Sequence, residues 1–336
     1  MRSRMRLAAV GMAVIGAVAV GQGQKKAHLN PMIELHAQKK PIFGLYAPSN
    51  PRGRGNRGGA AGAAGATAPV TPPPAPPVLK TPAELAKDAL AYDKSDFVFD
   101  GSMEGGVDRG IPAFTELVNA MGEAAPEVRW RHPLSVKTPE IAPDPAKAIE
   151  NISRQLNLGV STIVFVGVES ADEVKQGLAA MRPKSKGGTR PDDVGNAPKY
   201  WGLTEKEYRG KADLWPLNSD GELTNWTIVE SKAGLAKVRE IAAVRGISVL
   251  FPGAGTLRGV FTTTDAEGKR TFDAEGWEAA IQQVLAACKE FNLPCGYPAT
   301  EADIETRMKQ GFSVFIMNWG DPGFRAIDLG RKAAGR

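Results

Sequence analysis

Residues 225–232 read NWTIVESK, and residues 248–257 read SVLFPGAGTL. Each segment begins as a short apolar strand, and a helical pattern over 234–244 separates them. The first strand ends directly in a carboxylate, Glu230, and the second ends in a Gly-rich turn that carries Thr256. Strands that are apolar throughout are buried on both faces, as in a parallel sheet. A parallel α/β barrel keeps its chemistry at the carboxyl ends of its strands, so Glu230 is the strongest single indication of a functional site.

The same strand-then-helix unit recurs along the chain. Apolar runs bounded by turn residues predict strands over 41–48, 97–100, 128–131, 162–168, 225–230, 248–251, 295–297 and 313–317. Amphipathic patterns with capping residues predict helices over 81–93, 111–125, 144–158, 170–181, 234–244, 275–291 and 301–309. Eight such units predict an α/β fold, a (β/α)₈ TIM barrel. An open doubly wound sheet is the alternative, but the sequence has no Gly-rich dinucleotide fingerprint to support it.

Length and composition fit one barrel. The chain has 336 residues, of which 42% are hydrophobic and 24% charged. Residues 49–80 form a low-complexity stretch of Gly, Ala and Pro, which cannot bury enough apolar area to fold. We therefore predict a disordered insertion after the first strand, with the barrel beginning over 22–48 and continuing over 81–336.

The first 21 residues have the pattern of a signal peptide. Arg2, Arg4 and Arg6 precede an apolar run over 7–20, and small residues follow it. The run is about 14 residues long, short for a membrane span of roughly 20. We predict an exported protein, periplasmic or secreted, that meets a membrane only through this segment; an uncleaved anchor is the alternative.

The formal net charge of +5 does not indicate nucleic-acid binding. Much of the excess lies in the N-terminal segment and in the Gly-rich stretch, and no basic helix with interleaved aromatic residues is present.

Cysteine and histidine are scarce. Cys288 and Cys295 have no partner at metal-site spacing, so we predict two small core residues, with a disulfide as the alternative. The three histidines do not indicate a His-based zinc centre, because His28 and His36 precede the predicted barrel or lie at its edge. Among them His132 follows the predicted strand over 128–131, which places it near the site.

Polar residues at the predicted strand ends are the candidates for chemistry: Asp100, Arg129, Arg131, Glu169, Glu230, Thr256 and Asn318. Carboxylates suit Mg²⁺ or Mn²⁺, and an arginine suits a substrate carboxylate. The alternative is that these are solvated loop residues. Residues 186–191 read KGGTRP, a loop that could cradle an anion through its backbone N–H groups or be a plain surface loop.

Together these residues resemble the HpcH/HpaI aldolase and citrate lyase β-subunit family, over about Asn30 to Arg325. The matching segments are 30–31 with 41–45, 97–101, 128–129, 168–173 and, most specifically, 229–232 followed by 241–246. The resemblance implies a (β/α)₈ barrel that assembles as a homo-oligomer, a trimer or a hexamer. It also implies a divalent metal that binds pyruvate or a related 2-oxo acid and stabilises the enolate formed on cleavage.

The resemblance assigns roles to individual residues. Glu230 matches a metal carboxylate, and Arg129 matches the arginine that steadies the oxo acid and takes part in catalysis. Substrate contacts fall on Gly188 and Arg190 in the Gly-rich loop, and on Gly253 and Thr256 after the sixth strand.

The sequence departs from the family pattern at two positions. Thr256 stands where the family has a second metal carboxylate, and Met103 or Gly105 stands where it has an acid/base histidine. Glu169 is then the candidate replacement metal ligand, and Glu104 the candidate proton shuttle.

Two functions follow as expectations. The first is a metal-dependent carbon–carbon lyase that cleaves a 2-oxo-acid aldol to pyruvate or a related oxo acid plus an aldehyde. The alternative is a catalytically degenerate barrel that binds a small carboxylate or serves in assembly.

Overall fold

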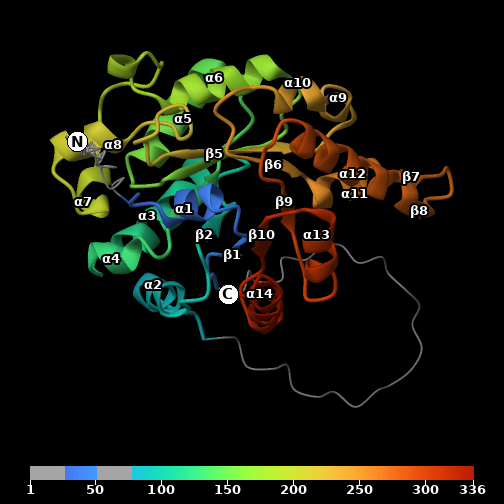
Figure 1. Ribbon diagram of the computed structural model, residues 1–336, viewed down its shortest axis with the longest axis horizontal. Coiled ribbons are helices and arrows are strands. Elements are labelled where there is room, and N and C mark those ends of the chain that lie inside the picture. The colour runs from blue at the N-terminus through green and yellow to red at the C-terminus, as the bar shows by residue number, and fades with distance from the viewer. Residues whose placement is uncertain (1–26, 51–77) are drawn as a thin grey trace, which may run out of the picture.

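The computed structural model describes residues 27–50 and 78–336 (Figure 1). Within them, eight parallel strands form one sheet in the order β6-β5-β4-β3-β2-β1-β10-β9. An isolated parallel bridge between Leu250 and Cys295 joins the two edges, so the sheet curls into a barrel. The strands are β1 Ile42–Tyr46, β2 Val98–Asp100, β3 Leu134–Lys137, β4 Thr162–Phe165, β5 Thr224–Val229, β6 Val249–Pro252, β9 Gly296–Pro298 and β10 Val314–Met317.

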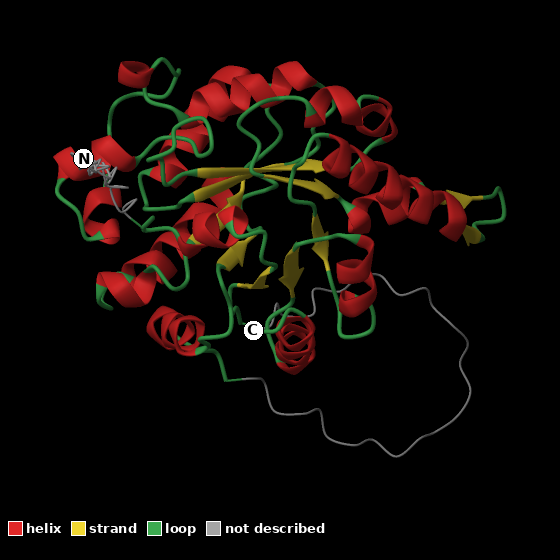
Figure 2. Ribbon diagram, in the orientation of Figure 1, coloured by secondary structure: helices red, strands yellow, loops and turns green. Residues whose placement is uncertain are grey.

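Helices surround the strands, as Figure 2 shows. They are α1 Pro31–Ala37, α2 Pro82–Ala91, α3 Val107–Met121, α4 Pro126–Arg129, α5 Pro145–Leu156, α6 Ala171–Met181, η1 Lys184–Lys186, α7 Ala197–Trp201, α8 Glu205–Lys211, α9 Lys232–Ala236, α10 Val238–Ala242, α11 Ala254–Val260, α12 Ala274–Glu290, α13 Ile304–Gln310 and α14 Asp321–Ala333. The predicted (β/α)₈ barrel is confirmed. We call the end where the strands terminate the C-terminal face and the opposite end the N-terminal face.

The predicted strand over 128–131 is wrong. These residues lie in and just after the short helix α4, which Pro126 begins because its fixed backbone angle suits a first helical position. The third strand is β3, which starts after Pro133. Also missed were helices α1 and α14, and the antiparallel hairpin of β7 Thr262–Thr264 and β8 Arg270–Phe272, which projects beside α11 and α12 (Figure 1).

The side chains inside the barrel form an apolar core that is separate from the core between the strands and the surrounding helices. Because side chains alternate along a strand, Trp226 and Ile228 of β5 face this core, whereas Val229 packs outward against the helices. The Trp226 ring lies edge-on to Phe97 at 4.9 Å and next to Phe251 at 5.4 Å. Packed aromatic rings fill the barrel, so ligands can enter only at its two faces.

The stretch predicted as an insertion falls between β1 and α2. Its residues 51–77, like the signal peptide predicted over 1–21, lie outside the described residues. The Asn50 side chain exchanges two hydrogen bonds with the backbone of Lys80, at 2.8 and 2.7 Å, so the two ends of the stretch meet at the C-terminal face. No helix over 27–50 or 78–336 is long and apolar enough to span a bilayer.

Candidate active site at the C-terminal face

Inward-facing side chains are apolar along the strands, but those at the C-terminal end of the barrel, which we call its mouth, are mostly polar. One step beyond Ile228 the inward-facing position is Glu230, and one step beyond Ser135 it is Lys137. The same count along the other strands adds Tyr46, Gly253 and Asn318. These residues form a polar layer over the apolar core, at the face where barrel enzymes keep their chemistry.

Glu230 is held in one orientation. Its carboxylate accepts a hydrogen bond from the Gly167 N–H at 2.9 Å, and its side chain packs against Gly253. A Cβ at position 253 would overlap the Glu230 Cβ, so any other residue there would displace Glu230. The residue is 8% exposed and forms no ion pair with any described residue. A buried carboxylate without a counter-charge is costly unless something else compensates it.

Lys137 and Glu104 form an ion pair at the same mouth. The Lys137 ammonium lies 2.9 Å from both carboxylate oxygens of Glu104. The lysine side chain is 14% exposed and that of the glutamate 40%. Burial raises the pKa of Tyr46; the Lys137 charge opposes this rise, whereas Glu104 and Asp100 add to it. Tyr46 thus shares the electrostatic environment of the pair.

Two cavities open at this face and share Glu104 as a wall. One, of about 380 Å³, is lined by Glu104, Glu140, Asn151 and Glu230, with Pro139, Lys147 and other residues around them. The second, of about 660 Å³, is lined by Tyr46, Asp100, Ser102, Asn318 and Trp319 among others. A small ligand that bridges the cavities would touch Glu104 and come within reach of Lys137.

The described residues contain no cluster of three or more His, Cys, Asp or Glu side chains arranged to hold a metal. Two carboxylates nevertheless flank Gly167, because Glu140 lies against its Cα and Glu230 bonds its N–H. Mg²⁺ keeps several waters and needs only one or two protein carboxylates when the substrate supplies oxygen ligands. The uncompensated Glu230 carboxylate in a cavity fits such a cation.

Arg129 lies at the opposite end of the barrel from this layer. It is 6% exposed in α4, where its guanidinium donates to the carbonyls of Gly122 and Lys199 and covers the Tyr200 ring at 5.1 Å. Burial lowers its pKa. The structure therefore does not bring Arg129 together with Glu230.

Gly188 and Arg190 also lie at the N-terminal face, because their loop leads from α6 into β5. The backbone N–H groups of Gly188 and Arg190 already donate to Pro183 and Arg182, so this loop has none to offer an anion. Arg190 is 1% exposed. The sequence reasoning misplaced this loop because it read composition and not the direction of the connection.

Three other candidates stand apart from the cavity beside Glu230. Glu169 is exposed and accepts a 2.6 Å hydrogen bond from the Ser231 hydroxyl. Thr256 is exposed on α11 and is not among the residues lining this cavity. His132 is wholly buried before β3, at the N-terminal face, so its predicted place near the site is wrong. Gly253 and Glu104 do lie beside the Glu230 cavity.

The two cysteines follow the alternative prediction, a disulfide. Cys288 and Cys295 are buried, as expected, but they form a disulfide between the end of α12 and the start of β9.

Lys137 is the residue that sequence reasoning missed. The signal was present, since Leu134-Ser135-Val136-Lys137 is a strand pattern that ends in a cation. This strand was overlooked because the preceding segment, Val128 to Arg131, has a similar pattern, which predicts the third strand there.

The protein is a (β/α)₈ barrel with a polar, acidic layer at the C-terminal face, which is the face that barrel enzymes use for their chemistry. The chain belongs to the HpcH/HpaI aldolase/citrate lyase family, whose sequence profile matches residues 135–318. Members of this family are aldolases and lyases. Among curated proteins, none matches the chain in sequence.

Solved structures share the fold at low identity. An HpcH/HpaI aldolase/citrate lyase family protein from Burkholderia cenocepacia J2315 is 18% identical, with a TM-score of 0.60 over 91% of this chain and 98% of that one. The HpcH/HpaI aldolase from Desulfitobacterium hafniense DCB-2 is 14% identical, with a TM-score of 0.58 over 90% and 94%. Macrophomate synthase is 16% identical, with a TM-score of 0.55 over 91% and 86%.

Proposed function

We propose that the protein is a carbon–carbon lyase that cleaves a 2-oxo-acid aldol to pyruvate, or a related oxo acid, and an aldehyde. One observation carries the proposal. Glu230 is a buried carboxylate that forms no ion pair among the described residues, and the Gly167 N–H fixes it at the wall of an open cavity. Family membership supplies the reaction class.

Glu230 is the residue that would hold a divalent cation, Mg²⁺ or Mn²⁺. When bound, such a cation supplies Lewis-acid stabilisation of negative charge on a substrate oxygen. Gly167 fixes the carboxylate, and the absent side chain at Gly253 gives it room.

Lys137 and Glu104 would serve the organic part of the substrate. The Lys137 ammonium donates hydrogen bonds to the carboxylate of the oxo acid and offsets its charge. Glu104, 2.9 Å from that ammonium, accepts the proton of the aldol hydroxyl as the carbon–carbon bond breaks. It then returns the proton to the carbon that the aldehyde has left, so the enzyme ends unchanged.

Calorimetric titration of the protein with Mn²⁺, with and without pyruvate, tests this function. We expect Mn²⁺ binding that strengthens when pyruvate is present and that Glu230→Gln removes. Arg190→Lys, a change at the other face, is the matched control and should leave the titration unchanged. Absence of Mn²⁺ binding to the parent protein would refute metal-dependent lysis.

A specific observation supports a second function, a barrel that binds a small carboxylate without catalysis. The family's second metal-ligand position is occupied by Thr256, an exposed neutral residue. On this alternative, pyruvate binds equally well with and without Mn²⁺, and Lys137→Met weakens it in both conditions.

We further propose that the protein is exported and acts as a homo-oligomer, a trimer or a hexamer. The Arg-rich start and the apolar run over 7–20 support export. Cell fractionation tests export, and light scattering coupled to size exclusion tests assembly.

A further inference from the structure

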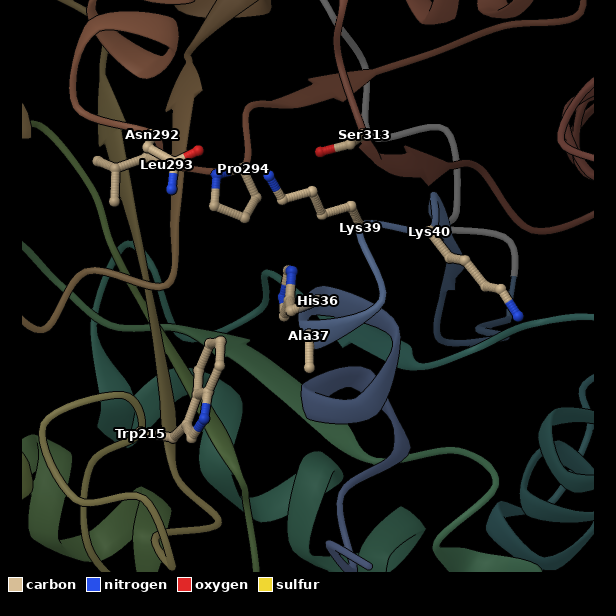
Figure 3. A pocket seen from close by; sticks show the side chains of 9 residues that line it. All are labelled: His36, Ala37, Lys39, Lys40, Trp215, Asn292, Leu293, Pro294 and Ser313. Carbon is tan, nitrogen blue, oxygen red and sulfur yellow. The ribbon is translucent and has the colours of Figure 1, made fainter.

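A separate cavity lies at the N-terminal face, where the strands begin (Figure 3). Its volume is about 330 Å³. Three regions form it: the end of α1, the segment before β5, and the turns that precede β9 and β10. The lining residues are His36, Ala37, Lys39, Lys40, Trp215, Asn292, Leu293, Pro294 and Ser313. None of these segments contributes to the cavity beside Glu230, so the two are distinct.

The cavity is cationic. Its lining includes Lys39 and Lys40 but no Asp or Glu, and neither lysine forms an ion pair within the described chain. In Figure 3 the Lys39 ammonium reaches across toward Pro294 and Ser313, whereas Lys40 points away. Lys39 is therefore the charge that a ligand in this space would meet.

The cavity also contains an unsatisfied buried nitrogen. His36 is 8% exposed, and its Nε2 has no hydrogen-bond partner among the described residues. Burial lowers its pKa to about 4, so the ring is neutral at pH 7. The imidazole stacks on Trp215, with centroids 5.7 Å apart, and lies between that indole and Lys39 (Figure 3). A buried polar atom without a partner is unfavourable, and a ligand that forms a hydrogen bond to it removes that cost.

Two residues with left-handed backbone and one disulfide shape the walls of this cavity. Lys39 and Asn292, with φ of 54° and 53°, are the two non-glycine residues of the described chain in the left-handed region. Each directly follows the capping residue of a helix, α1 or α12, a position where glycine is usual. The disulfide between Cys288 and Cys295 closes the turn that carries Asn292 to Pro294.

We propose that this cavity is a second binding site, for a small planar organic anion such as an aromatic carboxylate. Trp215, Leu293 and Pro294 provide apolar surface for the ring. The Lys39 ammonium holds the carboxylate, and the His36 and Ser313 side chains supply further hydrogen-bonding groups. The last carbonyls of α1 accept hydrogen bonds from the Lys39 and Lys40 N–H groups, and those of α12 accept from the Asn292 and Leu293 N–H groups, which reduces the negative charge that these helix ends present to the cavity. The proposal is independent of the chemistry at Glu230.

Benzoate is the probe, measured by calorimetry on the whole protein. We expect saturable binding at one site and binding at least about tenfold weaker for neutral benzamide, which has the same shape. Lys39→Gly removes the ammonium and suits the left-handed backbone, so it should fold normally and weaken benzoate at least about tenfold. Lys309→Gln removes an exposed ammonium on α13 that does not line the cavity, and should bind benzoate within about twofold of the parent.

Glu230→Gln locates the binding, because it alters only the C-terminal face. Benzoate affinity that survives Glu230→Gln and falls in Lys39→Gly supports the second site. Affinity that falls in Glu230→Gln and survives in Lys39→Gly places benzoate at the mouth and overturns the proposal. Equal affinity for benzoate and benzamide, or no saturable binding, overturns it as well.

Discussion

A buried carboxylate lies just beyond each end of strand β5, and the two differ in the hydrogen bonds and ion pairs that they receive. Glu222 precedes the strand and is wholly buried. It accepts hydrogen bonds from the Leu29 and Asn30 N–H groups at 3.1 and 3.0 Å, and pairs with Lys211 at 3.0 Å. Glu230 follows the strand, and within residues 27–50 and 78–336 it has one N–H donor and forms no ion pair. One carboxylate is compensated by the fold, and the other is exposed to a cavity.

The difference teaches how to separate a structural charge from a functional one. A buried carboxylate whose lone pairs and charge are satisfied belongs to the architecture; here Glu222 ties the segment before α1 to the barrel. A buried carboxylate that forms no ion pair and faces an open cavity is a candidate ligand for a cation. Burial alone does not distinguish them.

Breaking the structural carboxylate should give the largest effect. Glu222→Gln leaves Lys211 without its partner and weakens the bonds to Leu29 and Asn30, so we expect a loss of about 3–5 kcal/mol in the free energy of unfolding. Chemical denaturation measures this loss. Mn²⁺ affinity, measured on the folded variant, should not change; a parallel loss of Mn²⁺ affinity would mean that the two ends of β5 are coupled.

Removing the charge of Glu230 should give the reverse result. Glu230→Gln removes a charge that the fold does not compensate, so the free energy of unfolding should change by less than about 1 kcal/mol. Mn²⁺ affinity should fall by about 100-fold or more, close to 3 kcal/mol. A variant that loses several kcal/mol of stability and keeps its Mn²⁺ affinity would place Glu230 in the same class as Glu222.

His36 sharpens the comparison through pH. Its pKa is about 4 in the folded protein against 6.5 when unfolded, because burial disfavours the charged ring. Above pH 6.5 both states are neutral and His36 contributes nothing. As the pH falls from 6.5 toward 4 the unfolded state takes up the proton first, so stability drops, by about 2 kcal/mol at pH 5.

His36→Gln is the control for this titration, since it removes the imidazole. Chemical denaturation at pH 7 and pH 5 gives the loss of unfolding free energy on acidification. This loss should be about 2 kcal/mol smaller for the variant than for the parent. An unchanged difference would assign the acid sensitivity to other groups, among them His132, whose pKa burial also lowers.

The smallest effect tests which cation serves the oxo acid. Lys137→Met should weaken pyruvate binding about tenfold, close to 1.4 kcal/mol, because it removes the ammonium beside the cavity. Arg129→Met should leave pyruvate binding unchanged, since Arg129 lies at the other face and bonds to carbonyls. Pyruvate binding that depends on Arg129 and not on Lys137 would reverse the assignment.

The strand pattern made the barrel predictable, and one strand shows where prediction failed. Residues 128–131 (VRWR) and 134–137 (LSVK) both alternate apolar and polar side chains and both end in a cation, which is a strand pattern. Pro126 begins a helix at the first, and only pairing with β2 and β4 selects the second. Because the third strand was predicted six residues too early, Arg129 was assigned to the site in place of Lys137. For the same reason His132 was predicted near the C-terminal face, whereas it lies at the N-terminal face.

By itself the sequence determined the periodic strand–helix order, the apolar interior and the place of Glu230 after β5, because these depend on local pattern and on alternation along a strand. The tertiary structure decided which polar residues meet. It moved Arg129, Gly188 and Arg190 to the N-terminal face, because the connections from helix to strand run there. It also brought Lys137, Glu104 and Gly253 to the mouth with Glu230, since closing the sheet places side chains far apart in sequence within one layer.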